Sequence, residues 1–312
     1  MSSAGVKVNM QIEIKLTDLE IPNLKTRHFA MPEHSDIRMV VDIYPTRALL
    51  DDTPVARILF TKRFDGDSIY HLDTTLQLPP AHYTLLAWAD FVDRGTVENK
   101  YYNAADLREV SIITNPYVGY NAQKDAHAGR DTLNISENVD NPQTVSIALK
   151  RPLAHYQVWT TDVQEYINKH IIVNDSVPPL NTWQRLKIDW NYTAFRLPWH
   201  FNVSTMQADY PAPISYQHDV LITVDTVLLA EDYVLVTEKL QLDASFSISN
   251  PKGEMVNKDV PVKENLPRNK LTRIYDKYLT TKPEEKNEGI NIDDKFDEPD
   301  TIVDLNGQPY IE

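Results

Sequence analysis

The sequence contains no cysteine, only eight glycines and no long apolar run. The absence of cysteine excludes disulfides, thiol catalysis, iron–sulfur clusters and zinc sites built from thiolates. The G-x-S-x-G, G-x-G-x-x-G and P-loop motifs are also missing, so neither a nucleophile elbow nor a phosphate-binding loop is expected. No apolar stretch approaches the roughly 18 residues of a membrane-spanning helix. The sequence therefore gives no support for nucleophilic or nucleotide-dependent catalysis, and we expect a protein that is not an enzyme.

Basic residues are also in the minority. The chain has 31 Lys and Arg against 45 Asp and Glu, a net charge of −14. Because phosphate binding needs clustered Lys and Arg, nucleic acid is not an expected partner. Much of the negative charge lies at the end of the chain, where residues 283–312 hold ten acidic side chains against two lysines, a net of −8. This acidic tail lacks the spacing of a Ca²⁺-binding loop, so we interpret it as a solvated segment.

Alternation of apolar and polar residues dominates the rest of the chain. Residues 8–16 alternate strictly, and 37–44 and 83–90 read as further strands. In 83–90 both faces are mostly apolar until Asp90, which predicts a strand covered on both sides. Short helices are expected at 103–108, capped by Asn103, and after Asp162. Turn residues recur at the spacing of a β-sandwich or Greek key, so the sequence predicts an all-β protein with a few short helices.

The pattern of strands starts again near residue 150. A chain of 312 residues is long enough for two domains, and both halves are rich in strand-like alternation. We therefore expect an N-terminal β-sandwich domain over residues 1–150. A C-terminal β-sandwich domain over 151–312 follows, with the acidic tail from about residue 283.

Metal and sugar sites have weaker signals. His127 lies between acidic residues, but no H-E-x-x-H motif is present, and a lone histidine near acids is usually solvated or packed in a core. No metal or cofactor is therefore expected. Trp183, Trp190 and Trp199 offer platforms on which sugar rings stack, although tryptophans in strands more often belong to the core. Glycan binding at a cell surface stays open as an alternative function.

Several short motifs, read in order, resemble fimbrillin-type proteins of Bacteroidetes, most closely the FimB/Mfa2-like fimbrial subunit family. The motifs are YTLLAWAD (83–90), KYYNAADLREV (100–110), DAHAGRD (125–131), RPLAHYQVWTTD (151–162), NYTAFRLPWHFNV (191–203), LT (279–280) and IDDKFD (292–297). Each motif is weak alone, but their order is specific. The residues that carry the resemblance are Trp88, Asp90, Tyr101, Tyr102, Asp125, Gly129, Arg151, Pro152, Asp162, Leu279 and Thr280, and we expect them to hold the fold.

The resemblance implies two tandem transthyretin-like Greek-key β-sandwich domains. It also implies an exported, non-catalytic lipoprotein at the outer membrane and cell surface, held by a lipid on a cysteine upstream of Met1. Such a protein is an anchor or tip component of a fimbria. Its partners would be other fimbrial subunits, together with surface ligands of host or bacterial origin.

In this class, assembly implies strand complementation, in which one subunit's strand fills a groove in its neighbour's sheet. The alternating segment at the start of the chain suits such a strand, and our hypothesis is that it pairs into the N-terminal domain's sheet. Its apolar residues are Val8, Met10, Ile12, Ile14 and Leu16. Polymerising relatives are cleaved after a basic residue, for which Arg27, Arg38 and Arg47 are the available sites, whereas anchor-type relatives are not cleaved.

Overall fold

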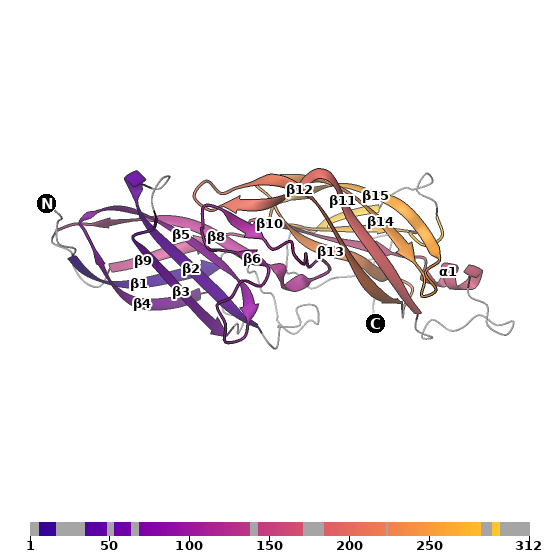
Figure 1. Ribbon diagram of the computed structural model, residues 1–312, viewed down its shortest axis with the longest axis horizontal. Coiled ribbons are helices and arrows are strands. Elements are labelled where there is room, and N and C mark those ends of the chain that lie inside the picture. Colours follow the sequence, from indigo (N-terminus) through magenta and orange to yellow (C-terminus); the bar gives the residue numbers. More distant parts are fainter. Residues whose placement is uncertain are drawn as a thin grey trace.

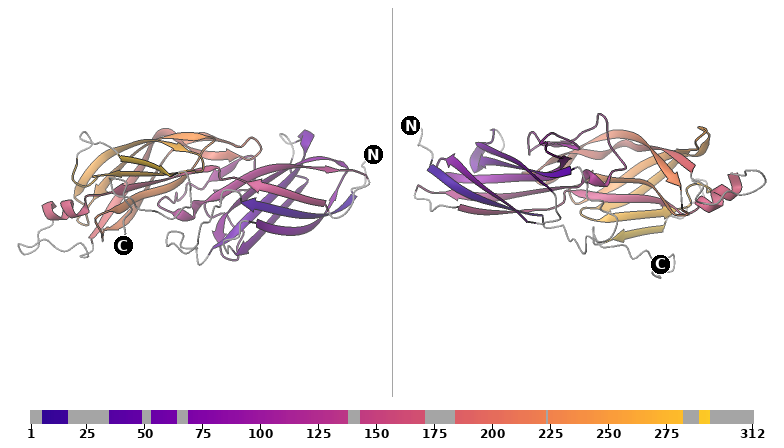
Figure 2. Two further views of the ribbon diagram at one scale, coloured as in Figure 1. Left: turned by 180° about the vertical axis from the view of Figure 1, so that it is seen from behind. Right: turned by 90° about the horizontal axis from the view of Figure 1, so that it is seen from below.

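The computed structural model describes residues 6–16, 35–48, 53–63, 69–137, 143–170, 184–222, 224–281 and 289–293. The first half contains β1 (Val6–Leu16), β2 (Ser35–Pro45), β3 (Ala56–Arg63), β4 (Ile69–Leu78), β5 (Ala81–Asp93), β6 (Tyr102–Asn103), β7 (Val110–Ile112), β8 (Ala126–Ile135) and β9 (Gln143–Leu149). The second half contains β10 (Leu153–Thr160), α1 (Val163–His170), β11 (Gln184–Asn202), β12 (Gln207–Ile222), β13 (Val227–Leu235), β14 (Lys239–Ser249), β15 (Met255–Pro267), β16 (Leu271–Asp276) and β17 (Gly289–Asp293). The halves lie end to end in an elongated molecule, with α1 at the end farthest from β1 (Figures 1 and 2).

The first half is a sandwich of two sheets. Their strand orders are β4-β1-β9 and β3-β2-β5-β8. Successive side chains of a strand point to opposite faces, so every second residue of β1, β2 and β5 reaches the space between the sheets. A single apolar core fills this space, with residues from both sheets. This packing buries one face of each sheet and explains the strict alternation of the first strand.

Strand β5 is covered on both faces, which confirms the prediction for this segment. Tyr83, Leu85, Ala87 and Ala89 point into the core of the first sandwich. Leu86 and Trp88 on the opposite face belong to a second buried cluster at the junction between the halves. Both rows of side chains are at most 1% exposed. The run is therefore almost uniformly apolar because it has no solvent-facing side.

The second half is also a sandwich. One sheet has the order β13-β10-β16-β17; the other contains β15, β14 and β11, with β12 paired along the remaining edge of β11. Among the described residues, the apolar core between these sheets is the largest. The predicted all-β sandwich class is confirmed. Within the described ranges, no helix combines the length and apolarity needed to cross a membrane.

The two sandwiches share a buried junction. β6 and β7 belong to the first half of the sequence, yet β7 pairs with β11 and extends a sheet of the second half. Trp88 and Tyr102 from the first half pack in one cluster with Phe201 and Tyr233 from the second. The boundary near residue 150 stays a prediction, because secondary structure and core both pass from one half to the other.

The helix predicted at 103–108 is absent, and that prediction is wrong. The segment forms turns, with Asn103 in β6 and its side-chain oxygen bound to the N–H of Ala105 (3.1 Å). The guanidinium of Arg57 donates to the carbonyl oxygens of Ala104 and Ala105. Those oxygens would accept the i+4 bonds of a helix, so Arg57 takes the acceptors that the helix would need.

The helix predicted after Asp162 is present as α1, but Asp162 does not cap it with its side chain. The backbone N–H of Gln164 instead donates to the carboxylate of Asp225 (2.8 Å), in the loop between β12 and β13. An aspartate at this position satisfies one of the free N–H groups of the first turn. The side chain of Asp162 is therefore available for another contact.

Candidate functional site

Strand β1 is the middle strand of its sheet. It runs antiparallel to β4, from Val6 opposite Leu78 to Lys15 opposite Ile69. It runs parallel to β9, from Met10 opposite Gln143 to Leu16 opposite Leu149. Its inward side chains Val8, Met10, Ile12 and Ile14 are at most 2% exposed. The first strand therefore fills a slot between β4 and β9, and without it two strand edges and one side of the core would be open.

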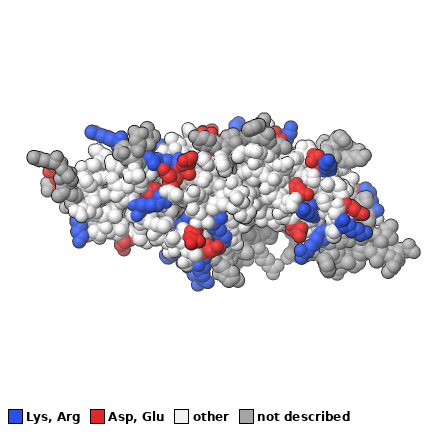
Figure 3. All heavy atoms as spheres, viewed as in Figure 1, with Lys and Arg blue, Asp and Glu red and all other residues white. Residues whose placement is uncertain are grey.

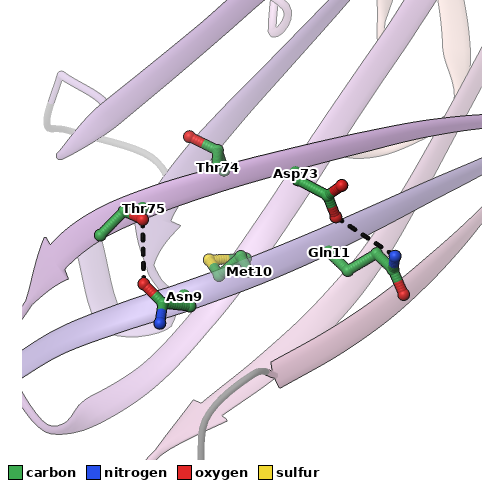
Figure 4. Close-up of a pocket in the computed structure, with 6 residues that line it drawn as sticks. All are labelled: Asn9, Met10, Gln11, Asp73, Thr74 and Thr75. Carbon is green, nitrogen blue, oxygen red and sulfur yellow. Dashed lines mark hydrogen bonds between the residues drawn. The ribbon is translucent and has the colours of Figure 1, made fainter.

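The outward face of β1 carries polar side chains that bind their neighbours across the sheet. Gln11 Nε2 donates to Asp73 Oδ1 (3.2 Å), and Thr75 Oγ1 donates to Asn9 Oδ1 (2.9 Å). Figure 4 shows both contacts beside a shallow surface depression over β1 and β4. On the other side, Ser146 Oγ of β9 donates to Glu13 Oε1 (2.9 Å). The slot thus holds β1 by an apolar inner row and a polar outer row.

Three strands at sheet edges carry residues that discourage pairing with another chain. β3 presents the exposed cations Lys62 and Arg63. β12 contains Pro211 and Pro213, which lack the N–H that a new strand would need. β15 likewise contains Pro261. Such edges oppose strand addition, so the slot of β1 is better suited to accept a strand than these three edges are.

Asp162 joins two motifs that lie far apart in the sequence. Its carboxylate accepts hydrogen bonds from the N–H groups of Leu279 (3.1 Å) and Thr280 (2.7 Å). It also accepts from the hydroxyls of Thr280 (2.7 Å) and Thr160 (2.5 Å). Asp162 is only 2% exposed. The TD and LT motifs therefore form one buried joint at the end of β10 and the chain after β16.

Asp125 and Arg151 form a second joint. Two parallel bonds of 2.7 Å link the guanidinium of Arg151 to the carboxylate of Asp125. Burial raises the pKa of Asp125, but Arg151, together with His127 and the N–H of Ala126, outweighs burial and lowers that pKa from its ordinary value. A Cβ on Gly129 would lie 2.4 Å from the carbonyl oxygen of Ala148, so β8 and β9 approach each other too closely for a larger residue. The carbonyl oxygen of Pro152 accepts a hydrogen bond from the backbone N–H of Val236, the residue after β13 (2.9 Å).

Trp88, Asp90, Tyr101 and Tyr102 lie at the junction. Arg38 donates twice to the Asp90 carboxylate (2.8 and 2.6 Å) and once to the carbonyl of Tyr102 (3.2 Å). The rings of Trp88 and Tyr102 meet edge to face with centroids 5.3 Å apart. The hydroxyl of Tyr101 accepts a bond of 2.9 Å from an asparagine side chain. The motif residues are thus buried, apart from the partly exposed Thr280, and none of them lies in β1.

The sequence of residues 2–308 matches a protein family that is described as a family of unknown function (DUF6562). The chain belongs to this family. No curated protein matches the sequence of this DUF6562 chain.

Several solved structures from Porphyromonas gingivalis and Bacteroides species are similar to this DUF6562 chain. The fimbrial anchor protein Mfa2 from Porphyromonas gingivalis matches at 9% identity and TM-score 0.49, over 92% of this chain and 97% of Mfa2. The tip fimbrial protein Mfa3 from the same organism, truncated at its C-terminus, matches at 10% identity and TM-score 0.42. The match covers 93% of this chain and 100% of Mfa3. A proposed polysaccharide-binding protein (DUF1812) from Bacteroides thetaiotaomicron matches at 10% identity and TM-score 0.44. The match covers 86% of this chain and 91% of that protein. Fimbrial subunits, which the sequence motifs resemble, are therefore among the similar structures.

The sequence did not reveal a buried ionic network in this DUF6562 chain. Lys124 Nζ lies 2.6 Å from Asp232 Oδ1, and both side chains are at most 1% exposed. The hydroxyls of Tyr117 and Tyr192 also donate to the carboxylate of Asp232. The hydroxyl oxygens of Tyr156 and Tyr192 lie 2.5 Å apart and share a hydrogen bond. Burial lowers the pKa of Lys124, and Asp232 opposes that shift. The network links the halves, but a single lysine in a polar segment gives no signal that it will be buried.

The other sequence candidates have different surroundings. His127 is 4% exposed, and the described part of the chain has no group of three metal-ligating side chains that could hold an ion. Trp183 lies outside the described residues. Trp190 is 1% exposed and stacks on Phe246 in the core, so its interpretation as a sugar platform is wrong. Trp199 is partly exposed and stacks on a histidine ring.

Surface charge is mixed on the face seen in Figure 3. Blue and red side chains of the described residues lie close together there and are separated by wide uncharged areas. Nucleic-acid binding needs a continuous basic patch, and this face offers none among those residues.

Proposed function

We propose that the chain is a non-catalytic subunit of a cell-surface fimbria, an anchor or tip component that assembles by β-strand complementation. The observation that carries the proposal is β1, a strand buried between β4 and β9. The ordered motifs shared with fimbrial subunits support the same function. The proposal places the protein at the outer membrane, with other fimbrial subunits as partners and surface ligands as further ones.

The contacts of β1 are of the kind that a separate strand can supply. Its backbone bonds to β4 and β9 do not depend on side chains, and its inner row fills the core at every second residue. In strand addition the backbone provides affinity and the alternate side chains provide fit. A strand from a neighbouring subunit that carries an apolar row of the same spacing would therefore satisfy the same slot.

Exchange of β1 for a peptide tests this proposal. A protease site placed between residues 17 and 34 allows β1 to be cut from the folded protein without deleting it. We expect the cut protein to stay folded and then take up a labelled peptide of residues 6–16, while the uncut protein takes up none. A variant that lacks residues 1–20 should be destabilised and recover when the peptide is added. If the cut protein and the shortened variant both fail to bind the peptide, strand complementation through β1 is refuted.

A specific observation favours the alternative, binding of a surface glycan. Trp159 of β10 and Tyr275 of β16 lie opposite each other, with ring centroids 6.2 Å apart and planes at 20°. Both are partly exposed on the sheet face away from the core. Gln157 accepts bonds from Arg273 (3.4 Å) and Trp159 (3.3 Å) beside them. Aromatic rings next to planar polar groups suit a sugar.

Glycan-array binding checks this alternative. A glycan bound by the wild-type protein should be lost in Trp159→Ala and retained in Trp199→Ala, the matched control. Equal binding by the wild type and both variants would exclude the patch as the sugar site.

A further inference from the structure

The apolar inner row of β1 cannot by itself fix the register of a strand in the slot. A slip of one residue would turn Val8, Met10, Ile12 and Ile14 to solvent and is therefore forbidden. A slip of two residues in either direction keeps an apolar residue at all four inward positions, because Val6 and Leu16 continue the alternating row. Because these side chains are similar in size, the core penalises such a slip only weakly. Another feature must set the register.

The outer row distinguishes the registers. In the native pairing, Gln11 lies opposite Asp73, and Glu13 lies opposite His71, with 3.8 Å between Glu13 Oε2 and His71 Nδ1. A slip of two residues in one direction brings Glu13 opposite Asp73, which places two carboxylates side by side. A slip in the other direction brings Glu13 opposite the apolar Ile69. Like charges directly opposite each other on neighbouring strands are destabilising, so the native register has the best outer row.

The outer row of the slot is also built by both neighbouring strands. Thr75 and Asp73 come from β4, and Ser146 comes from β9 (Figure 4 shows the β4 side). Thr75 is bonded here to a side-chain oxygen, Asp73 to an amide N–H, and Ser146 to a carboxylate. A strand from another molecule would meet this same order of donors and acceptors.

We propose that Thr75, Asp73 and Ser146 select both the register and the sequence of the strand that occupies the slot. The inference rests on the proposed strand complementation and names the partner that fits. That partner is an extended segment with four apolar residues at alternate positions. On its other face it carries an acceptor for Thr75, a hydrogen-bond donor for Asp73 and an acidic or amide side chain for Ser146. An acid opposite Asp73 marks a wrong partner or a wrong register.

Competition on the cut protein tests the selection. We expect a peptide of residues 6–16 with Gln11→Glu to bind about fivefold more weakly than the wild-type peptide, since it loses a donor and opposes two carboxylates. In cut protein with Asp73→Asn, the asparagine donates to the new carboxylate, so this peptide should bind within about twofold of the wild-type peptide. A peptide with Ile12→Asp should bind neither protein, which shows that the core slot is being measured.

The outcomes separate the two proposals. If the wild-type and Gln11→Glu peptides bind equally and the Ile12→Asp peptide does not, strand complementation stands and selection by the outer row is overturned. If no peptide binds, strand complementation fails. Urea unfolding of the uncut protein then tests whether the outer row stabilises β1 in its register. There Gln11→Glu should lower the urea midpoint and Asp73→Asn in the same molecule should restore it. An unchanged midpoint in the uncut Gln11→Glu variant overturns the inference.

Discussion

Replacing Asp162 by alanine should be one of the most damaging single changes in the second sandwich. The carboxylate accepts two backbone and two hydroxyl hydrogen bonds, from Leu279, Thr280 and Thr160, at 2.5 to 3.1 Å. Hydrogen bonds to a charged group contribute roughly 1.5–3 kcal/mol each, and a buried N–H left without a partner costs roughly 1–3 kcal/mol. Since bonds to one group are not additive, we expect a loss of about 3–5 kcal/mol in the free energy of unfolding.

Urea unfolding followed by tryptophan fluorescence measures this loss, because Trp190 lies in the core of the same sandwich. Asp162→Asn keeps one acceptor oxygen and should cost only about 1–2 kcal/mol. The control is Asp225→Ala, which removes the cap of α1 and should cost about 1 kcal/mol. If Asp162→Ala costs less than Asp225→Ala, or if Asn is as damaging as Ala, the carboxylate does not join the two motifs as described.

Two further predictions concern the first sandwich. Burial raises the pKa of Asp42 to about 6, and Arg57 offsets this only in part, so the folded state binds the proton more tightly than the unfolded chain. The contribution of Asp42 to stability should therefore increase as pH falls from about 7 to 4, by at most about 3 kcal/mol. In pH titrations of the unfolding free energy, the wild type should gain stability relative to Asp42→Asn over this range. Parallel profiles for the two proteins would contradict this assignment. Gly129→Ala should lower the melting temperature, at a cost of about 2 kcal/mol or more, because its Cβ would meet the carbonyl oxygen of Ala148. The control is Gly95→Ala, whose Cβ would meet no atom within 4 Å and which should cost only about 1 kcal/mol because Gly95 has a positive φ. An equal loss of stability in both variants would refute the close approach of Gly129 to Ala148.

Local patterns predicted the strands well, but they could not predict which distant segments meet. The alternation of residues 8–16 predicted a strand and its buried row, because period-two burial is a local property. Its parallel partner β9 begins more than 120 residues later, and no local pattern encodes that pairing. Asp125 and Arg151 were both identified from motifs, yet their ion pair depends on how the halves dock.

The missing helix at 103–108 and the buried lysine have a common cause. Both lie in the segment that crosses from the first sandwich to the second, where contacts with distant residues replace local ones. Arg57 takes the carbonyl oxygens that a helix would use. Asp232 supplies the charge that allows Lys124 to be buried. A buried ammonium without a partner would be very costly, so a sequence pattern could predict Lys124 only together with Asp232.

The energetics of β1 indicate how exchange would have to proceed. Four fully buried apolar side chains at roughly 1.5–3 kcal/mol each contribute roughly 6–12 kcal/mol, which is comparable to the total stability of a typical domain. A first sandwich with an empty slot would therefore be close to unfolding and would not persist as an assembly intermediate. An incoming strand must then enter while β1 leaves, so the exchange rate should rise with peptide concentration. A rate independent of peptide concentration would show instead that the empty slot forms first, and that the rest of the sandwich holds together without β1.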